Sequence, residues 1–382
     1  MKYIQRTAEL HLIQTLSRQF PIIAILGPRQ CGKTTLAKQT KHTHYFDLEN
    51  PRDLARFENP QLTLENLDGI IVIDEIQRKP DLFPLLRYMV DNNVKKQKYL
   101  ILGSASKELI QQSSESLAGR IAYYELGGFG IENFPDTIQR LWQRGGYPPS
   151  ILAKTESQSI EWREQYITTF LEKDIPQLGI QIPASTLRKF WTMLCHYHGQ
   201  ILNFSELGRS LSVSDTTIKK YLDILSGTFM IRLLMPWYVN IGKRLVKNPK
   251  LYIRDSGIFH TLHFIENFKQ LQSHPKLGAS WEGFVIQNVA RSLKKRNEEL
   301  AFYHTHAGSE LDLFWQNKGK SWGIECKYQD APTITKSMKI VIKDLQLSHL
   351  WVIYPGKEKY QLEKNITVLP AEQMPAVWKY SG

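Results

Sequence analysis

The stretch Phe20-Pro-Ile-Ile-Ala-Ile-Leu-Gly-Pro-Arg-Gln-Cys-Gly-Lys-Thr34 joins an apolar run to a glycine-containing loop that ends in lysine and threonine. The loop, Gly27–Thr34, matches the pattern G-x-x-x-x-G-K-[ST] at every fixed position. The apolar run before it is typical of a buried strand, and a helix is expected to open after it. This strand–loop–helix order is the context in which the pattern binds phosphates, and it predicts an α/β domain.

The chemistry of this phosphate loop follows from its residue types. Gly27 and Gly32 let the backbone turn and present its N–H groups to an anion, and the following helix directs its positive end at the same place. Lys33 is expected to reach the β- and γ-phosphates, and the Thr34 hydroxyl to join the shell of a Mg²⁺ ion. We expect ATP to be bound by Gly27, Pro28, Arg29, Gln30, Cys31, Gly32, Lys33, Thr34 and Thr35, with Asp74 described next.

A second apolar strand, Gly69–Ile73, ends in the carboxylates of Asp74 and Glu75, 41 residues after Lys33. Ligands of an open α/β sheet bind at the carboxyl ends of its strands. Asp74 is therefore expected to hold Mg²⁺, and Glu75 to polarise the attacking water, which favours ATP hydrolysis over transfer to a substrate hydroxyl. The alternative is an acidic turn that meets solvent.

Two further residues are candidates for the same site. Ser104 ends the strand after Asp74, where a hydroxyl would contact the γ-phosphate or orient the water; the alternative is a helix N-cap. Arg120 precedes the next strand, where a guanidinium would stabilise the transferring phosphate in its own subunit or in a neighbour's. The alternative for Arg120 is a surface arginine or a partner for a carboxylate.

The whole chain of 382 residues divides by pattern into three expected domains, 1–150, 151–255 and 256–382. The first alternates helices with five apolar strands, as a parallel sheet covered on both faces requires. The second is mostly helical, with a helix-turn-helix over 204–225 and an expected hairpin of 229–235 with 237–239, giving a winged helix. The third has the order helix, three strands, helix, strand. The five strands of the first domain are expected at 20–26, 44–48, 69–73, 99–102 and 121–126.

The formal net charge of +12 favours a polyanionic partner such as nucleic acid. Lysines and arginines near the helix-turn-helix are candidates for holding DNA phosphates; the alternative is a lid or spacer with solvated lysines. Three scattered cysteines, no signal peptide and no long apolar run predict a cytoplasmic protein without a membrane partner. The basic candidates are Lys219, Lys220, Lys243, Arg244, Lys247 and Lys250.

The third domain contains a pattern that favours metal-dependent phosphodiester cleavage. Glu325 and Lys327 alternate on one strand and so share a face, and Asp312 lies on the preceding strand across an expected hairpin. Asp312 and Glu325, with Glu282 from a preceding helix, would hold Mg²⁺, and Lys327 would position the water or the phosphate. The alternative is a solvated strand face with cross-strand ion pairs.

The chain resembles the AAA+ ATPases over its first 130 residues, and as a whole it resembles a bacterial and archaeal family of long-unknown function. That family pairs such an ATPase with a nuclease-like domain of the D…E-x-K type. The resemblance implies that Ser104 is a sensor, that Arg120 reaches a nucleotide, that the Arg144 turn begins a nucleotide-facing lid, and that copies self-associate. It is carried by the residues 3–6, 27–35, 73–77, 102–106, 116–120, 144–148, 170–175, 304–312 and 323–328.

The sequence therefore predicts an AAA+ parallel sheet, a winged-helix region and a restriction-endonuclease-like α/β domain. We expect an ATP-hydrolysing homo-oligomer that uses ATP and Mg²⁺ and acts on DNA, with metal-dependent nuclease activity in the third domain. The alternative is a nucleotide-dependent switch or scaffold whose third domain binds nucleic acid or protein without cleavage.

Overall fold

The computed structural model describes residues 4–92, 96–104, 115–238 and 246–377. The chain forms two compact units. The first is Met1–Gly128 with Gly227–Phe229, and the second is Phe129–Ser226 with Met230–Gly382. The expected second and third domains thus fall within one compact unit, and their division at residue 255 stays a prediction.

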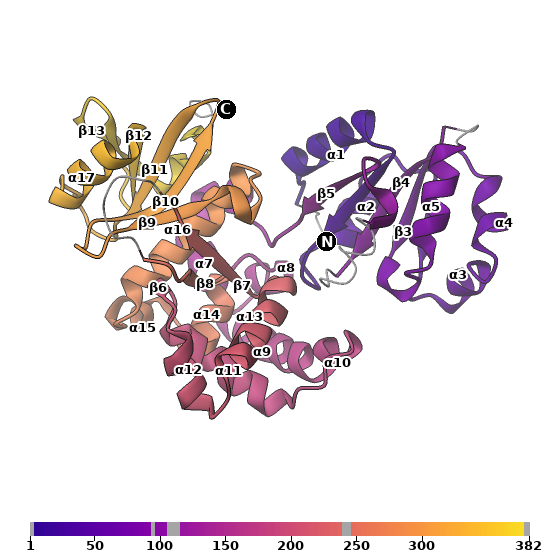
Figure 1. Cartoon of the computed structure of the whole chain (residues 1–382), viewed down its shortest axis with the longest axis horizontal. Helices are drawn as coiled ribbons and strands as arrows, with labels where there is room; N and C mark the ends of the chain where they lie inside the picture. The colour runs from indigo at the N-terminus through magenta and orange to yellow at the C-terminus, as the bar shows by residue number, and fades with distance from the viewer. Residues whose placement is uncertain (1–3, 93–95, 105–114, 239–245, 378–382) are drawn as a thin grey trace. The chain divides into compact units, whose positions relative to one another are not determined.

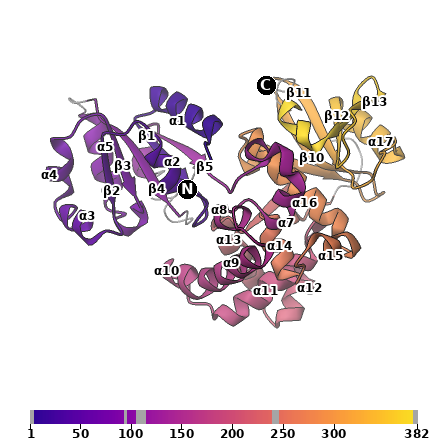
Figure 2. The ribbon, with the colours of Figure 1, turned by 180° about the vertical axis from the view of Figure 1, so that it is seen from behind.

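The first unit is built on a parallel sheet with the strand order β2-β3-β4-β1-β5 (Figures 1 and 2). The five predicted strands and their parallel arrangement are confirmed. The strands are β1 (Ile22–Leu26), β2 (His44–Asp47), β3 (Ile70–Asp74), β4 (Lys98–Gly103) and β5 (Ile121–Glu125). The helices are α1 (Thr7–Gln19), α2 (Lys33–Lys38), α3 (Pro51–Arg56), α4 (Pro60–Glu65) and α5 (Leu82–Asp91).

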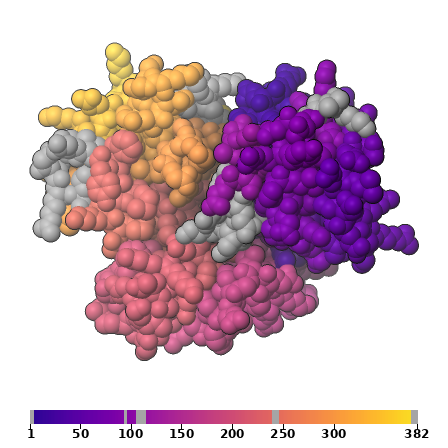
Figure 3. All heavy atoms as spheres, turned by 45° about the vertical axis from the view of Figure 1, so that its right-hand side comes forward, coloured from indigo at the N-terminus to yellow at the C-terminus, as the bar shows by residue number. Residues whose placement is uncertain are grey.

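Burial explains why these strands form. All five residues of β1 are buried, and so are Ile71, Val72 and Ile73 of β3, because helices cover the sheet. Phe57 and Phe83 pack in the same core. Figure 3 shows one outer face of this unit, in indigo and purple. The apolar core holds the carboxyl ends of β1, β3 and β4 in fixed positions at one edge of the sheet.

The second unit opens with helices. The helix α9 (Glu156–Thr169) continues through a π-helical turn, η4 (Phe170–Asp174), into α10 (Ile175–Gln177). None of the described helices is both long and apolar enough to cross a membrane. The other helices are α7 (Ile138–Arg144), α8 (Pro148–Ile151), α11 (Ala184–His196), α12 (Phe204–Leu211), α13 (Asp215–Gly227), α14 (Ser256–Leu262), α15 (Phe268–Ser273), α16 (Leu277–Ser292) and α17 (Lys336–Leu345).

A mixed nine-stranded sheet with the order β13-β14-β12-β11-β10-β9-β7-β8-β6 runs through this second unit. A parallel pair, β7 with β9, joins its two parts. The strands are β6 (Gln200–Ile201), β7 (Ile231–Pro236), β8 (Lys250–Ile253), β9 (Ala301–His304), β10 (Glu310–Asn317), β11 (Lys320–Cys326), β12 (Leu347–Tyr354), β13 (Tyr360–Glu363) and β14 (Ile366–Pro370).

The helix-turn-helix prediction matches α12 and α13, which are joined by a tight turn at Ser212. The expected hairpin partner was wrong, because β7 pairs with β8 and not with residues 237–239. Of that expected strand, residue 239 lies outside the described residues. Because β8 also pairs with β6, a small three-stranded sheet, β6-β8-β7, accompanies the two helices.

The C-terminal part has the predicted order, with α16 followed by β9, β10, β11, α17 and β12. The turn between β10 and β11 is tight, and its two residues, Lys318 and Gly319, both have positive φ. The strands β13 and β14 extend the sheet beyond the predicted elements. The resulting hairpin of β10 and β11 positions the acidic residues described below.

Candidate nucleotide site and C-terminal acidic cluster

The phosphate loop follows β1 and leads into α2. A side chain at Gly27 would place its Cβ 2.1 Å from the carbonyl oxygen of Leu126, so only glycine fits there. Gly32 has φ 102°, in the left-handed region that glycine adopts without strain. The two glycines therefore set the path of the loop.

Lys33, the first residue of α2, is 6% exposed. Its Nζ donates to the carbonyl oxygens of Gly27 and Pro28, both at 2.9 Å. The ammonium is thus held inside the curve of the loop, where the phosphates of a nucleotide would meet its charge.

Asp74, at the end of β3, is the centre of the site. Its Oδ2 accepts hydrogen bonds from the Thr34 hydroxyl at 2.7 Å and from the Tyr45 hydroxyl at 2.6 Å. Burial, together with the hydrogen bond to Asp74, raises the pKa of Tyr45, so this residue stays a donor at neutral pH. Hydroxyl and carboxylate oxygens are the ligands that Mg²⁺ prefers, so Thr34 and Asp74 fit the expected ion.

Glu75 follows Asp74 with φ 57°. Gln77 donates from its Nε2 to the Glu75 carboxylate. Burial raises the pKa of Glu75, against the opposing effects of the Gln77 hydrogen bond and the charge of Lys33. A raised carboxylate pKa suits a group that takes a proton from water, the role expected from the sequence.

Arg6, just before α1, is a further contributor that the residue patterns do not reveal. It is 4% exposed, and its guanidinium donates to the carbonyl oxygen of Cys31 at 2.7 Å and to that of Gly127 at 3.1 Å. It thereby ties the phosphate loop to the end of β5. The only sequence signal was its place in the Tyr3–Arg6 segment of the family resemblance.

Ser104 and Arg120 lie at opposite ends of the parallel strands. Ser104 directly follows β4, which lies between β1 and β3, and so sits at the phosphate-loop edge. Arg120 precedes Ile121, which pairs with Ile22 at the far end of β1, roughly 13 Å from the loop by strand length. Its guanidinium donates from Nε to Asp91 Oδ1 at 2.6 Å and from Nη2 to Asp91 Oδ2 at 2.9 Å. These hydrogen bonds lower the pKa of the Asp91 carboxyl. Arg120 is thus a partner for a carboxylate, which was the alternative to its expected role at the nucleotide.

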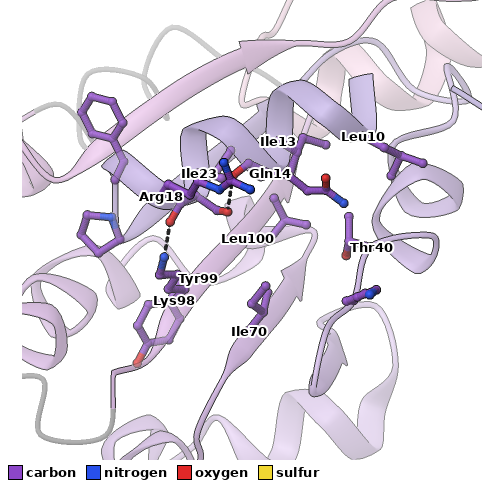
Figure 4. A pocket seen from close by; sticks show the side chains of 14 residues that line it. Leu10, Ile13, Gln14, Arg18, Ile23, Thr40, Ile70, Lys98, Tyr99 and Leu100 are labelled. Carbon is purple, nitrogen blue, oxygen red and sulfur yellow. Dashed lines mark hydrogen bonds between the residues drawn. The ribbon is translucent and has the colours of Figure 1, made fainter. Parts of the chain in front are cut away.

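A hollow of about 380 Å³ lies at this same far edge of the sheet. In Figure 4, Leu10 and Ile13 of α1 lie over Leu100 of β4, and Lys98 is directed toward α1. The Lys98 Nζ donates to the carbonyl oxygen of Ser17. Since the phosphate loop follows the other end of β1, this hollow is separate from the nucleotide site.

In the second unit, the hairpin brings Asp312 and Glu325 together. Leu313 pairs with Ile324, and the two carboxylates occupy the next position along the strand pair. Asp312 Oδ2 accepts from the Cys326 backbone N–H at 2.8 Å. The Lys327 Nζ lies 2.7 Å from Glu325 Oε1. The expected convergence of these side chains is therefore present.

Lys250 of β8 was expected among the DNA-contacting residues, and this expectation was wrong. It is 3% exposed, and its Nζ lies 3.2 Å from Glu282 Oε1 and 3.7 Å from Asp312 Oδ1, and also pairs with Glu310. Burial alone would lower the pKa of Lys250, but the surrounding acidic groups raise it well above its usual value. Lys243 and Arg244 lie outside the described residues.

These contacts bear on the expected metal ligands Glu282, Asp312 and Glu325. Within the part of the chain that the structure describes, no three His, Cys, Asp or Glu side chains are arranged to hold a metal ion. Burial and neighbouring carboxylates raise the pKa of Asp312 well above its usual value, and burial raises that of Glu325. The residues therefore do not fit a metal ion as they stand, because a lysine lies among the carboxylates.

The Arg144 turn, which the resemblance assigns to a lid, lies in the second unit. The Arg144 side chain is buried, and it donates to Glu156 Oε1 from Nε at 2.8 Å and to the carbonyl oxygen of Ala153 at 2.7 Å. Its role as a nucleotide-facing lid stays a prediction.

Three stretches of the chain match known families. Residues 19–135 match the family described as AAA domain, whereas residues 135–269 and 277–374 match two domains of unknown function, DUF8612 and DUF4143. Among solved structures, the Walker-type ATPase PABY2304 of Pyrococcus abyssi is similar in fold, with a TM-score of 0.50 and 15% sequence identity. The similarity covers 68% of this chain and 96% of that one.

Two relatives are the uncharacterized proteins Rv2008c of Mycobacterium tuberculosis and Mb2031c of Mycobacterium bovis. Each is 46% identical to this chain over 374 residues, which is 97% of this chain and 84% of the relative. The match of residues 19–135 to the AAA domain lies within this shared length, and the chain therefore belongs to the family of these mycobacterial proteins.

Proposed function

We propose that the chain binds ATP with Mg²⁺ and hydrolyses it. The observation that carries this proposal is the meeting of Thr34, Asp74 and Glu75 at one edge of the sheet, beside the buried ammonium of Lys33. A site that only bound nucleotide would not need a second carboxylate with a raised pKa next to the Mg²⁺ ligand.

Each residue has a separate part in the reaction. The loop amides and Lys33 bind the phosphates, and Thr34 and Asp74 hold the ion, which supplies charge stabilisation on the γ-phosphate. Glu75 accepts the proton of the attacking water, and Gln77 keeps its carboxylate oriented. Ser104 would orient that water, and Arg120 would reach a nucleotide only in a second copy of the chain.

The test compares binding and hydrolysis in matched variants. Lys33→Ala should weaken ATP binding, because it removes the charge that faces the phosphates. Glu75→Gln should keep ATP binding but lower the hydrolysis rate by roughly 100-fold or more. Glu65→Gln, an exposed residue of α4, is the control and should hydrolyse at the wild-type rate. Wild-type turnover by Glu75→Gln would show that Glu75 is not the base.

We also propose that the second unit binds DNA. Supporting this are the net charge of +12, the pair α12 and α13 with the small sheet beside it, and the exposed Lys219, Lys220 and Lys247. Because the acidic cluster does not fit a metal ion as it stands, binding without cleavage is favoured over the nuclease alternative.

Salt dependence and charge reversal test DNA binding. Affinity should fall as salt rises, since neutralised phosphates release counterions, and reversal of the three lysines to glutamate should weaken binding at every salt concentration. Reversal of Lys357, Lys359 and Lys364, exposed residues near β13, makes the same change of charge and is the control. An equal loss of DNA affinity in both triple variants would show that binding depends on net charge alone and not on Lys219, Lys220 and Lys247.

A further inference from the structure

The acidic cluster of the second unit, Glu282, Glu310, Asp312 and Glu325, is already paired with ammonium groups. Lys250 contacts the first three of these residues, with Nζ–oxygen distances of 3.2 Å to Glu282 and 3.7 Å to Asp312 and a direct pair with Glu310. Lys327 contacts the fourth at 2.7 Å. Lys250 comes from β8, far in sequence from the hairpin that carries Asp312.

The geometry points to Lys250 as the permanent cation of the acidic cluster, in the place where the expected Mg²⁺ would otherwise bind. The C-terminal site is then independent of divalent metal. This inference does not rest on the proposed ATPase activity, because it concerns residues of the second unit alone.

At least one oxygen of each carboxylate in the cluster is engaged, whereas the buried Glu325 Oε2 has no hydrogen-bond partner. Glu282 Oε1 accepts from the Tyr252 hydroxyl at 2.5 Å as well as from Lys250. Asp312 Oδ2 accepts from the Cys326 N–H. Hard cations such as Mg²⁺ and Mn²⁺ require several free oxygens around one point, and among the described residues no three acidic side chains are arranged to supply them.

Lys250 is also difficult to displace. Its side chain is 4% exposed, and its Nζ lies 5.6 Å from the centroid of the Phe302 ring. Moving it away would leave the buried Asp312 and the partly exposed Glu282 and Glu310 without their cation, and an uncompensated buried charge is strongly destabilising. A metal ion would have to supply that energy before any binding appeared.

The same argument predicts that removing the ammonium creates a metal site. In Lys250→Met, a side chain of similar length replaces the cation with an apolar group, and the three carboxylates are left without their ammonium. Such a variant should bind Mn²⁺ where the wild type does not.

The experiment titrates the full chain with Mn²⁺, without nucleotide, and follows free Mn²⁺ by electron paramagnetic resonance. Every protein carries Asp74→Asn, which removes the expected metal ligand of the first unit. The parent should leave the Mn²⁺ signal unchanged, whereas Lys250→Met should take up about one equivalent. Lys339→Met, which removes an exposed lysine paired with Glu363 at 3.4 Å, is the matched control and should behave as the parent.

The result that overturns the inference is Mn²⁺ binding by the parent that Asp312→Asn abolishes. Absence of binding by a folded Lys250→Met would overturn it as well. Tryptophan emission shows whether Lys250→Met folds. If this variant does not fold, the inference is tested by titrating the parent and the charge-preserving Lys250→Arg with Mn²⁺. Both should remain free of bound Mn²⁺, and binding by either would contradict the inference.

Discussion

At the scale of single residues, Arg6 fixes the phosphate loop from outside the loop sequence. It donates to the carbonyl oxygens of Cys31 and Gly127. We expect Arg6→Met to raise the dissociation constant for ATP about tenfold, since loss of a charged hydrogen bond costs roughly 1.5 kcal/mol or more.

The Arg6 prediction is checked by titration with a fluorescent ATP analogue. Arg18→Met, an exposed arginine of α1, is the control and should bind as the wild type does. Because Arg6 is a positioning residue, Arg6→Lys should restore part of the affinity. Unchanged affinity in Arg6→Met would show that the loop keeps its shape without this residue.

The residues of the nucleotide site differ in how far the sequence could predict them. The sequence could predict Thr34, Asp74 and Glu75, because each belongs to or directly follows a loop or strand that a local pattern identifies. Tyr45 and Arg6 were not, because their contacts with Asp74 and Cys31 join segments whose distance in space depends on the finished sheet. A hydroxyl on β2 carries no local sign that it will meet a carboxylate on β3.

At the scale of elements, the hairpin of β10 and β11 was predictable from alternation and a glycine turn, and so was the meeting of Asp312 with Glu325. The place of Lys250 was not. Lys250 follows the basic residues Lys243, Arg244 and Lys247 along the chain, so it was grouped with the candidates for DNA contact, whereas pairing of β8 with β7 and β6 buries it. Prediction of the wrong hairpin partner for β7 led directly to this error.

Helix α14 is joined to its neighbours through the buried His260. Its Nδ1 lies 2.9 Å from the carbonyl oxygen of Gln143, and its Nε2 lies 2.7 Å from the Ser280 hydroxyl, which also accepts from Trp142 Nε1. The carbonyl oxygen can only accept, so His260 carries a proton on Nδ1. Burial lowers the pKa of His260 to about 3.

This histidine should make the second unit sensitive to acid. Below pH 6.5 the unfolded state binds a proton that the folded state excludes until about pH 3, so stability falls as pH falls through that range. Between pH 6.5 and 5 the loss should be roughly 2 kcal/mol. In His260→Gln that part of the pH dependence should disappear, whatever the effect on stability at neutral pH.

Urea unfolding at pH 7.5 and pH 5, followed by tryptophan emission, measures the effect. All nine tryptophans lie at or beyond residue 142, so the signal reports the second unit alone. The surface variant His11→Gln should keep the wild-type dependence on pH. The same dependence in His260→Gln would assign the acid sensitivity to other groups.

At the scale of the whole molecule, the predicted boundary at residue 255 divides a continuous sheet. Met235 pairs with Ala301 and Pro236 with Phe302, and Lys250 pairs with Glu310 across the same boundary. The pattern of expected elements changes near 255, but that pattern does not reveal that strands on the two sides pair. The predicted order of helix, three strands, helix and strand was right beyond this boundary, whereas before it the expected hairpin partner of β7 was wrong.

A truncation experiment follows from this continuity. Residues 129–382 should fold alone, because they keep the whole nine-stranded sheet, whereas residues 256–382 should aggregate through the uncovered edge of β9. Size-exclusion chromatography and tryptophan emission distinguish the two outcomes. A monomeric, folded 256–382 fragment would show that β7 and β8 are not needed for the C-terminal part.

The parallel pairing of β7 with β9 also sets a delay during synthesis on the ribosome. The strand β7 is complete at Pro236, but its partner residue Phe302 follows 66 residues later, which takes about 3 to 13 s at ordinary rates of translation. For that interval the edge of β7 that later pairs with β9 is unpaired and can pair with other nascent chains. Rare codons between the two strands would lengthen the exposure, so the yield of folded protein should depend on the speed at which this segment is translated.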